Sequence, residues 1–443
     1  MRAVSSLAVA AAALYAVLCV AGDLKEHLAL YLGCHAALVV LMLLAWRVVA
    51  AGGPAVFRAM LLAAVGFRLI AATALPTLSD DVYRYVWDGR LQVAGHHPYK
   101  FAPSDPMRAE LRDAAIYPKV NHPEIPTIYP PLAEILFAVC ALAKLGVAGF
   151  KIAMAALDVG VIWALLRLLR ALNVPRDRVV LYAWNPLAVI EIAGSGHVEP
   201  LGILFLVLAI AWLVEGKATR AGAALGAAIQ AKLLPLILVP GFARRMKVWA
   251  LAAMLAVVAV TTVPYAARGP WYGTGVVAYA ERWEHGSVVF AGVRRFFEWA
   301  DAAPHVKGVI AWAQARCGST ATWVWDAAYR LAWPEALARM TVTLLALIFA
   351  MAQSFRSRLD PAHEARLALG GAILLAPTLH PWYVLWVLPL AAAQAAGGWL
   401  LFGALVPLQY VAGAGDVPWS IRLVILLPSL AWMVRDALLG FRR

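Results

Sequence analysis

Charged residues are scarce in this sequence of 443 residues: Asp, Glu, Lys and Arg make up 14% of the chain, whereas hydrophobic residues make up 63%. A soluble domain carries about 25% charged and about 45–50% apolar residues, so the composition excludes that class of protein. The sequence therefore predicts a polytopic membrane protein.

Cysteine is also rare, with four residues in the whole chain. Three of them, Cys19, Cys34 and Cys140, lie in apolar stretches, and Cys317 lies in a polar segment without a partner nearby. This pattern excludes a disulfide framework and a metal site built on cysteines.

Acidic residues are few as well, since 25 Asp and Glu stand against 38 Lys and Arg and leave a net charge of +13. The basic residues occur in short clusters between apolar segments, such as Arg244, Arg245 and Lys247. Short basic loops are typical of the cytoplasmic side of a membrane protein, so these clusters indicate topology, and we expect no nucleic-acid partner.

Long apolar runs are what the sequence does contain. A helix needs about 20 apolar residues to cross a bilayer, and a helix satisfies its own backbone hydrogen bonds there. The apolar segments cover residues 3–21, 28–48, 56–76, 132–146, 150–170, 179–193, 200–215, 220–243, 247–265, 336–354, 365–379, 383–396, 398–412 and 420–440. We predict an all-α fold of about 11–13 transmembrane helices, forming a single domain over residues 1–443.

Two adjustments bring the basic clusters to one side of the membrane. Residues 132–146 are taken as a juxtamembrane helix, and residues 220–243 as two short re-entrant helices broken around Lys232. Broken helices are tolerated in membranes where they line a polar cavity. The adjusted topology places the polar segments 77–129, 194–200, 266–335 and 378–383 together on the extracytoplasmic face. A site assembled from these segments is therefore expected there.

The loop at 266–335 holds seven of the 18 tryptophans of the chain. Tryptophan and tyrosine favour the boundary between membrane and water, so this loop predicts amphipathic helices that lie on the bilayer. An alternative is a platform for the acceptor or a lipid tail, in which aromatic faces stack against sugar rings.

The stretch Ser79–Arg90 brings carboxylates, guanidiniums and aromatic rings together directly after an apolar span. The adjacent carboxylates of Asp80 and Asp81 are suited to act as a general base. Arg84 and Arg90 are suited to bind phosphate, because a planar guanidinium meets two oxygens at once. The alternative is an amphipathic helix anchored at the membrane interface by its aromatic residues.

This stretch, followed by Gly95-His96-His97-Pro98-Tyr99, resembles the first extracytoplasmic loop of integral-membrane glycosyltransferases of the GT-C fold. The nearest likeness is to mannosyltransferases that use polyprenol-phosphate mannose and to PIG-M-like enzymes. Further motifs in the matching order are Tyr129-Pro130-Pro131-Leu132, Gly196-His197-Val198-Glu199-Pro200, Lys232 with Pro235, and His380-Pro381-Trp382-Tyr383. The resemblance covers roughly residues 65–390.

The resemblance implies that one sugar, with mannose expected, passes from a polyprenyl-phosphate donor to a lipid or glycan acceptor. It places the reaction on the extracytoplasmic face of the inner or plasma membrane, with inversion at the anomeric carbon. Relatives keep an Asp in a Ser-x-Asp-Val-Tyr context, which matches Asp81. Asp81 is the expected base, and Asp80 is the alternative or a neighbour that positions the acceptor.

Other residues are expected to bind the donor phosphate or the substrates. They are Arg68, Tyr83, Arg84, Asp88, Arg90, Tyr129, His197, Glu199, Lys232, His380 and Tyr383. Some have simpler explanations: a buried or snorkelling cation for Arg68 and Lys232, and a turn or helix end for His197 and His380. No metal site or other cofactor is predicted, although Asp80, Asp81 and Glu199 together leave a divalent cation open.

A transporter or flippase for polyprenyl-linked saccharides is the alternative function, since it would also combine many spans with cationic residues at a cavity. Transporters usually show internal repeats. The sequence shows no such repeat, and its acidic pair lies in a loop, which favours the enzyme. The sugar, the acceptor, the linkage and the oligomeric state remain open at this stage.

Overall fold

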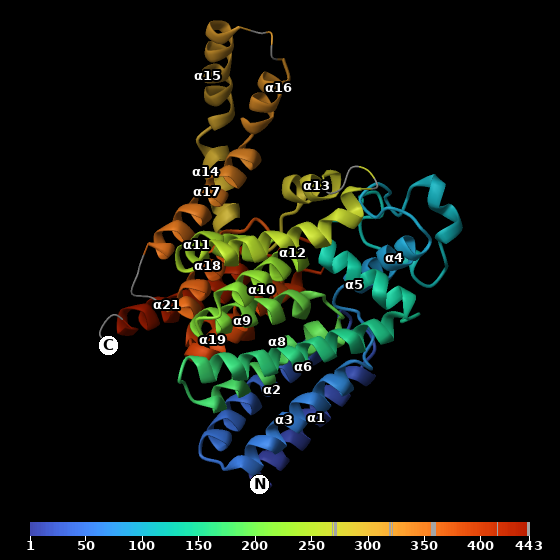
Figure 1. Cartoon of the computed structure of the whole chain (residues 1–443), viewed down its shortest axis with the longest axis vertical. Coiled ribbons are helices and arrows are strands. Elements are labelled where there is room, and N and C mark those ends of the chain that lie inside the picture. Colours follow the sequence, from blue (N-terminus) through green and yellow to red (C-terminus); the bar gives the residue numbers. More distant parts are fainter. Residues whose placement is uncertain are drawn as a thin grey trace.

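The computed structural model describes residues 1–267, 269, 273–318, 320, 322–355, 360–413 and 415–440. Within these ranges every regular element is a helix (Figure 1), and the β-type pairing consists of isolated bridges from His285 and Gly286 to Thr378. The predicted all-α class of a polytopic membrane protein is confirmed.

Six long apolar helices have the length and composition needed to cross a membrane. They are α1 (Arg2–Val20), α2 (Leu28–Ala50), α3 (Pro54–Ala71), α6 (Val147–Ala171), α12 (Val248–Ala266) and α17 (Pro334–Ser354). The shortest has 18 residues, which at a rise of 1.5 Å per residue is about 27 Å. Each of them matches an apolar segment found in the sequence.

The remaining segments are shorter or interrupted. The other α-helices are α4 (Asp81–Val93), α5 (Pro131–Leu142), α7 (Val180–Ala183), α8 (Pro186–Ala188), α9 (Glu199–Val214), α10 (Ala218–Ala231), α11 (Val239–Arg245), α13 (Thr274–Arg282), α14 (Val288–Trp299), α15 (Ala302–Cys317), α16 (Thr322–Leu331), α18 (Pro361–Leu375), α19 (Leu388–Gln394), α20 (Gly397–Leu405) and α21 (Trp419–Gly440). Short 3₁₀ segments are η1 (Pro106–Leu111), η2 (Tyr117–Lys119), η3 (Arg176–Val179), η5 (Leu234–Leu238), η6 (Pro381–Trp386) and η7 (Val406–Ala412), and η4 (Val189–Gly194) is a π-helix.

Two segments predicted as single helices, 179–193 and 383–396, are in fact broken. The first consists of η3, α7, α8 and the π-helix η4, with a break at Asn185, whose side chain accepts from the backbone N–H of Leu187. The second consists of η6 and α19. A proline cannot donate the helical hydrogen bond and disfavours helical geometry in the preceding residue, and Pro186, Pro381 and Pro389 lie at these positions.

The break predicted around Lys232 is present. Helix α10 ends at Ala231, Lys232 has extended backbone angles (φ −159°, ψ 142°), and η5 with Pro235 follows. The chain thus exposes a charged side chain at an interruption between two helical pieces.

The first polar loop folds into α4, η1 and η2. Helix α4 packs closely on α5, because a Cβ added at Gly89 would lie 2.3 Å from the carbonyl oxygen of Phe137. Pro130 precedes α5 in an extended conformation and Pro131 is its first residue, a position that proline favours because its backbone needs no N–H partner there. The close contact with α5 fixes the direction of α4.

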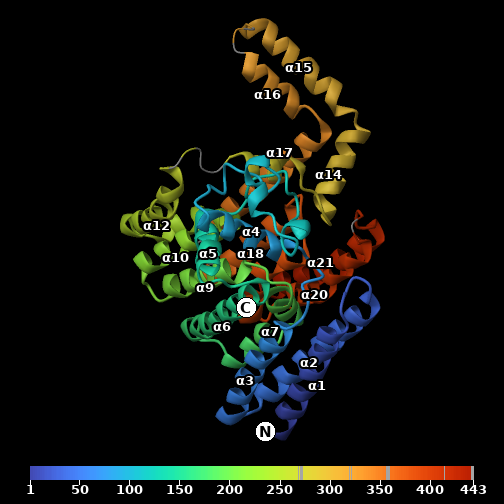
Figure 2. The same cartoon turned by 90° about the vertical axis from the view of Figure 1, so that its right-hand side faces the viewer.

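The second polar loop is helical as well, and α15 and α16 project from the body of the molecule as an arm (Figures 1 and 2). Of its seven tryptophans, Trp271 lies outside the described residues. Trp299 is 82% exposed and Trp323 is 76% exposed. The predicted position of this loop on the bilayer stays a prediction.

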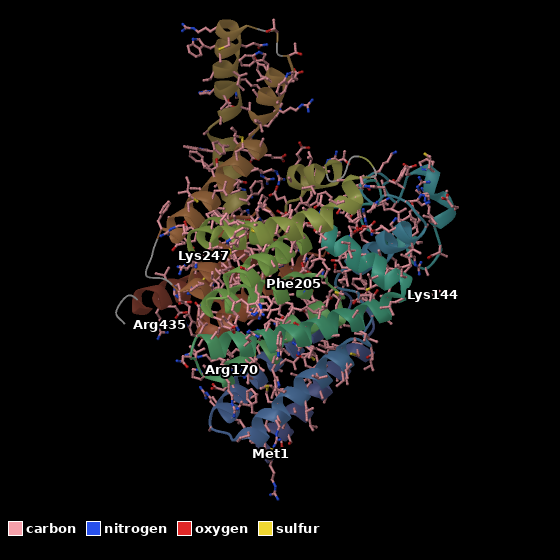
Figure 3. The ribbon with its side chains drawn as sticks, viewed as in Figure 1. Met1, Lys144, Arg170, Phe205, Lys247 and Arg435 are labelled. Carbon is pink, nitrogen blue, oxygen red and sulfur yellow. The ribbon has the colours of Figure 1, made fainter. Side chains whose placement is uncertain are left out.

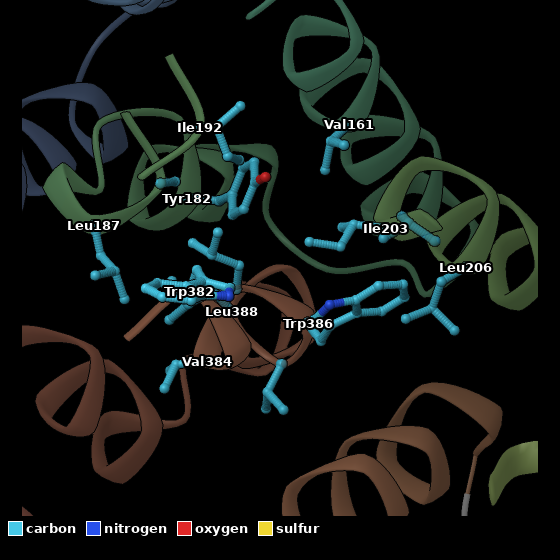
Figure 4. Packing of buried hydrophobic residues seen from close by; sticks show 14 of the residues in the cluster. Val161, Tyr182, Leu187, Ile192, Ile203, Leu206, Trp382, Val384, Trp386 and Leu388 are labelled. Carbon is cyan, nitrogen blue, oxygen red and sulfur yellow. The ribbon is translucent and has the colours of Figure 1, made fainter. Parts of the chain in front are cut away.

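The core lies where α6, the segment η3–η4, α9 and the segment η6–α19 meet. Figure 4 shows Trp386 beside Ile203 and Leu206 of α9, and these side chains are almost completely buried. A Cβ at Gly202 would lie 2.2 Å from the ring of Trp386, so only a residue without a side chain leaves space for the tryptophan. This packing anchors η6.

Basic residues from two of the sequence clusters lie on the side of the molecule away from α4. Figure 3 shows Arg170 and Lys247 on the left side, whereas α4 and α5 lie on the right side, near Lys144. Basic clusters that the sequence assigns to the cytoplasm are therefore remote from the Ser79–Arg90 stretch.

Candidate functional site

A cavity of about 270 Å³ lies where α4, the segment before α5, the break at Lys232, α13 and η6 meet. Its polar and aromatic lining consists of Asp81, Arg84, Asn121, His122, Tyr129, Lys232, Tyr279, Trp283, His380, Trp382, Tyr383 and Trp386. Its volume is just under the roughly 300–1,000 Å³ usual for small-molecule sites. One sugar ring is a suitable occupant by size.

The structure brings several of the predicted site residues to this cavity. Those that line it are Asp81, Arg84, Tyr129, Lys232, His380 and Tyr383. His197 and Glu199 lie directly behind its wall, since His197 approaches Asp81 and Glu199 pairs with Lys232. The segments involved are remote in sequence, so only the folded chain makes them neighbours.

Asp81 is the first residue of α4, and its side chain is 18% exposed. Its Oδ1 accepts a hydrogen bond of 2.6 Å from Nδ2 of Asn121, and its Oδ2 accepts one of 3.4 Å from the hydroxyl of Tyr85. A negative charge in the first turn of a helix is stabilised by the helix dipole. Asp81 is thus an oriented carboxylate at the cavity surface.

Arg84 lies one turn further along α4, and two hydrogen bonds hold its guanidinium in place. Its Nε donates to Oδ2 of Asp88 at 2.8 Å, and its Nη1 donates to the carbonyl of His122 at 3.5 Å. Burial raises the pKa of Asp88, and the charge of Arg84 opposes that rise. Nη2 of Arg84 is buried and has no hydrogen-bond partner among the described residues, which leaves a donor for an anion.

Lys232 provides a second cation at the cavity. Its Nζ donates to Oε1 of the buried Glu199 and lies 4.3 Å from the ring centroid of Tyr383. The hydroxyl of Tyr383 in turn contacts that of Tyr279 from α13. The helix break therefore carries a cation that is held in place and retains further N–H donors.

Four rings stack in sequence along one wall. The centroids are 4.4 Å apart for His285 and His380, 4.4 Å for His380 and Trp382, and 4.1 Å for Trp382 and His197. Burial lowers the pKa of His380 well below its ordinary value, and the neighbouring His285 and Lys232 lower it further. The assignment of His380 to donor-phosphate or substrate binding stays a prediction, and this shift favours the neutral imidazole over a cation.

Four predicted residues lie elsewhere. Asp80 is exposed at the start of α4, and Arg90 pairs with Asp113 on the surface. Arg68 pairs with the buried Asp158 between α3 and α6, and Tyr83 contacts Lys119. The helical period explains this division within α4. Arg84 and Asp88, three and seven residues after Asp81, lie on the same face of the helix, whereas Arg90, nine residues after it, lies on the opposite face.

Sequence reasoning missed Glu191, a buried residue on the π-helix η4. Its Oε2 lies 3.4 Å from Nε2 of His197, and its Oε1 accepts a hydrogen bond of 2.8 Å from the hydroxyl of Tyr410. The available signal was that Glu191 is the single charged residue between 179 and 193. Ionisable residues within apolar segments are usually functional.

The carboxylates considered for a divalent cation do not form a site. Asp80 is outside the cavity and Glu199 is engaged by Lys232. In the part of the chain that the structure describes, no three His, Cys, Asp or Glu side chains are grouped in a way that could hold a metal ion.

Comparison with known proteins gives a consistent result. The family model described as "Alpha-(1->6)-mannopyranosyltransferase, N-terminal domain" matches residues 2–251, and the model described as "MptB C-terminal domain" matches residues 336–408. A probable alpha-(1->6)-mannopyranosyltransferase of Mycolicibacterium smegmatis is 40% identical over 68 residues, a match that spans 15% of this chain and 11% of that relative. No solved structure matches the chain.

Proposed function

The chain belongs to the alpha-(1->6)-mannopyranosyltransferase family, and from that premise we propose that it transfers one mannose from a polyprenyl-phosphate donor to a lipid or glycan acceptor. The observation that carries the proposal is the meeting of an oriented carboxylate, Asp81, with two cations, Arg84 and Lys232, at one cavity. These groups match the two needs of the reaction, a base and a site for a leaving phosphate.

In the proposed reaction Asp81 removes the proton from the acceptor hydroxyl. The acceptor oxygen forms a bond to the anomeric carbon while the bond from that carbon to the phosphate oxygen breaks. The polyprenyl phosphate leaves with the electron pair, and a single displacement inverts the anomeric configuration. A positioned general base contributes about 10²–10⁴ to the rate of such a step.

The leaving phosphate gains negative charge as the bond breaks. Arg84 and Lys232 are placed to stabilise that charge, because preorganised cations act most strongly in a site that excludes water. The unused Nη2 of Arg84 and the remaining donors of Lys232 supply hydrogen bonds for this purpose.

The rest of the lining supports a lipid-linked donor. Ile125, Ile128, Leu233, Leu234 and Val276 surround the charged groups with apolar side chains, which suits the first units of a prenyl chain. The separation of α4 from the basic residues Arg170 and Lys247 supports an extracytoplasmic site (Figure 3). We propose that the protein lies in the inner or plasma membrane with this site on its extracytoplasmic face.

The test compares purified wild type with Asp81→Asn in lipid nanodiscs, supplied with polyprenyl-phosphate mannose, glucose or arabinose and membrane lipids. We expect mannose transfer by the wild type and a fall of about 10²–10⁴ in kcat for the variant. Asp80→Asn is the matched control, because it removes a neighbouring charge outside the cavity, and it is expected to retain activity within a few-fold.

Undiminished transfer by Asp81→Asn would refute the assignment of the base. If the wild type transfers none of the three sugars but moves the lipid-linked donor across the bilayer, the protein is a transporter instead.

A further inference from the structure

The buried carboxylate of Glu191 has no role in the reaction as described so far. It is completely buried on η4, and Tyr410 supplies a hydrogen bond to one oxygen. The other oxygen has His197 as its charged neighbour at 3.4 Å. A charge inside a protein is retained only when paired or hydrogen-bonded, so the two contacts account for how Glu191 is held.

His197 joins this carboxylate to the cavity. Its Nε2 lies 3.4 Å from Oε2 of Glu191, and its Nδ1 lies 3.6 Å from Oδ2 of Asp81. Neither nitrogen makes an aligned hydrogen bond within the described residues, so both are ion-pair contacts. Contacts of this kind in unliganded sites often shorten when the substrate binds.

The ring of His197 has little freedom to turn. One face stacks on Trp382, with centroids 4.1 Å apart and an angle of 24° between the planes. The preceding Gly196 has φ +84°, and a Cβ there would lie 2.9 Å from Cγ2 of Val82 and 3.0 Å from Cγ of Lys151. The edge of the imidazole is thereby directed at the two carboxylates.

We infer that Glu191 is a positioning residue for the reaction proposed above: through its contact with Nε2 it holds the His197 ring with Nδ1 towards Asp81, and so orients the Asp81 carboxylate. The inference rests on the proposed function, because it assigns Glu191 to the same base. Glu191 acts through His197 and does not line the cavity.

Ionisable groups lie near His197 on several elements. They are Asp81 from α4, Glu191 from η4, Glu199 from the start of α9 with its partner Lys232, His380 from the segment before η6, and Lys151 of α6 beside Gly196. Burial by itself lowers the pKa of His197, but the three carboxylates outweigh it, and the pKa is raised. The imidazolium can therefore donate to Glu191 and Asp81 together.

The π-helix η4 sets the direction of the Glu191 side chain. A π-turn is rare and occurs frequently at functional sites, because the extra residue per turn redirects a side chain. In η4 the carbonyl of Glu191 also accepts a hydrogen bond of 3.2 Å from the backbone N–H of His197. Backbone and side chain of Glu191 thus both contact the residue that we propose it orients.

The test measures the pH dependence of mannose transfer for Glu191→Gln. Without the charge of Glu191, His197 loses its proton more readily and Asp81 loses a neighbouring cation. The acid limb of the kcat profile should therefore move to higher pH by about one unit. At neutral pH kcat should fall about 10- to 100-fold, the size of loss typical of outer-shell residues that orient metal ligands, with KM for the donor unchanged.

Further variants separate positioning from folding. Glu364→Gln removes another buried glutamate, which pairs with Arg245 outside the cavity. The acid limb of the kcat profile of this variant should match that of the wild type. Glu191→Asp keeps the charge and should keep the wild-type acid limb, so it serves as the test if Glu191→Gln does not fold. His197→Gln should shift the limb as Glu191→Gln does, and the double variant should shift it no further.

An acid limb of Glu191→Gln that coincides with the wild type, or additive shifts in the double variant, would overturn the inference. A displaced acid limb in Glu191→Asp would do the same. These outcomes require an active wild type, whereas failure of the proposed function appears as an inactive wild type or an active Asp81→Asn variant.

Discussion

At the scale of single residues, the pair formed by Arg84 and Asp88 is the most sensitive point of α4. Both side chains are almost completely buried, at 7% and 1% exposed, and Nε and Oδ2 are 2.8 Å apart. Removing one member of a buried pair leaves the other charge without compensation, which costs about 3–5 kcal/mol.

We expect Arg84→Met to lower the free energy of unfolding by about that amount and the double variant Arg84→Met, Asp88→Asn to recover much of it. Because burial raises the pKa of Asp88, the folded state holds its proton to higher pH than the unfolded state does. The penalty in Arg84→Met should thus be larger at pH 8 than at pH 5. Thermal unfolding in detergent measures both effects, and a pH-independent loss would contradict this account.

The spacing of residues within α4 was readable from the sequence, whereas contacts between elements were not. Asp81 and Arg84 are three residues apart on one helix, so their common face follows from the helical period. The partner of Glu191, Tyr410, is 219 residues away. Local patterns carry no information on such a pair, and for that reason the role of Glu191 emerged only from the fold.

At the scale of elements, the contact between α4 and α5 at Gly89 determines where the cavity carboxylate lies. A methyl group there would meet the carbonyl oxygen of Phe137 at 2.3 Å, so the helices would have to separate. We expect Gly89→Ala to destabilise the protein by about 1–3 kcal/mol and to reduce transfer, although alanine is the better helix former by about 1 kcal/mol.

Gly66 in α3 is the matched control, because a Cβ there has no heavy atom within 4 Å. Gly66→Ala should leave the unfolding temperature unchanged or raise it slightly. Equal unfolding temperatures for the two variants would show that α4 and α5 are less tightly coupled than their packing indicates.

Apolar windows predicted the six long helices, but they missed the breaks at 179–193 and 383–396. A hydropathy window reports composition, and an interrupted apolar segment has the same composition as a continuous one. Lys232 was an exception, since a charge and a nearby proline marked its break. Pro186 and Pro389 carried the same kind of signal without a charge beside them.

At the scale of the whole molecule, the arm formed by α15 and α16 is separate from the cavity. If it lies on the bilayer, as its tryptophans predict, lipids brominated near the headgroup should quench fluorescence from Trp312 of α15 and Trp323 of α16, which are 58% and 76% exposed. The double variant Trp312→Phe, Trp323→Phe in vesicles should lose part of the quenchable emission. Trp399→Phe is the control, because Trp399 is 4% exposed. Stronger quenching of the wild type by aqueous acrylamide than by lipid would place the arm in water.

The stacked rings at the cavity wall have a consequence for sugar selection. Trp382 has His380 on one face and His197 on the other, so neither face is available to a sugar ring. In the proposed reaction the hexose then meets the other lining groups, among them the polar side chain of Asn121. A site that binds hydroxyls through hydrogen bonds rejects analogues lacking them by about 10⁴–10⁵, far more than an apolar pocket does. Discrimination between mannose and its deoxy analogues would thus arise from individual hydroxyl contacts rather than from stacking on Trp382.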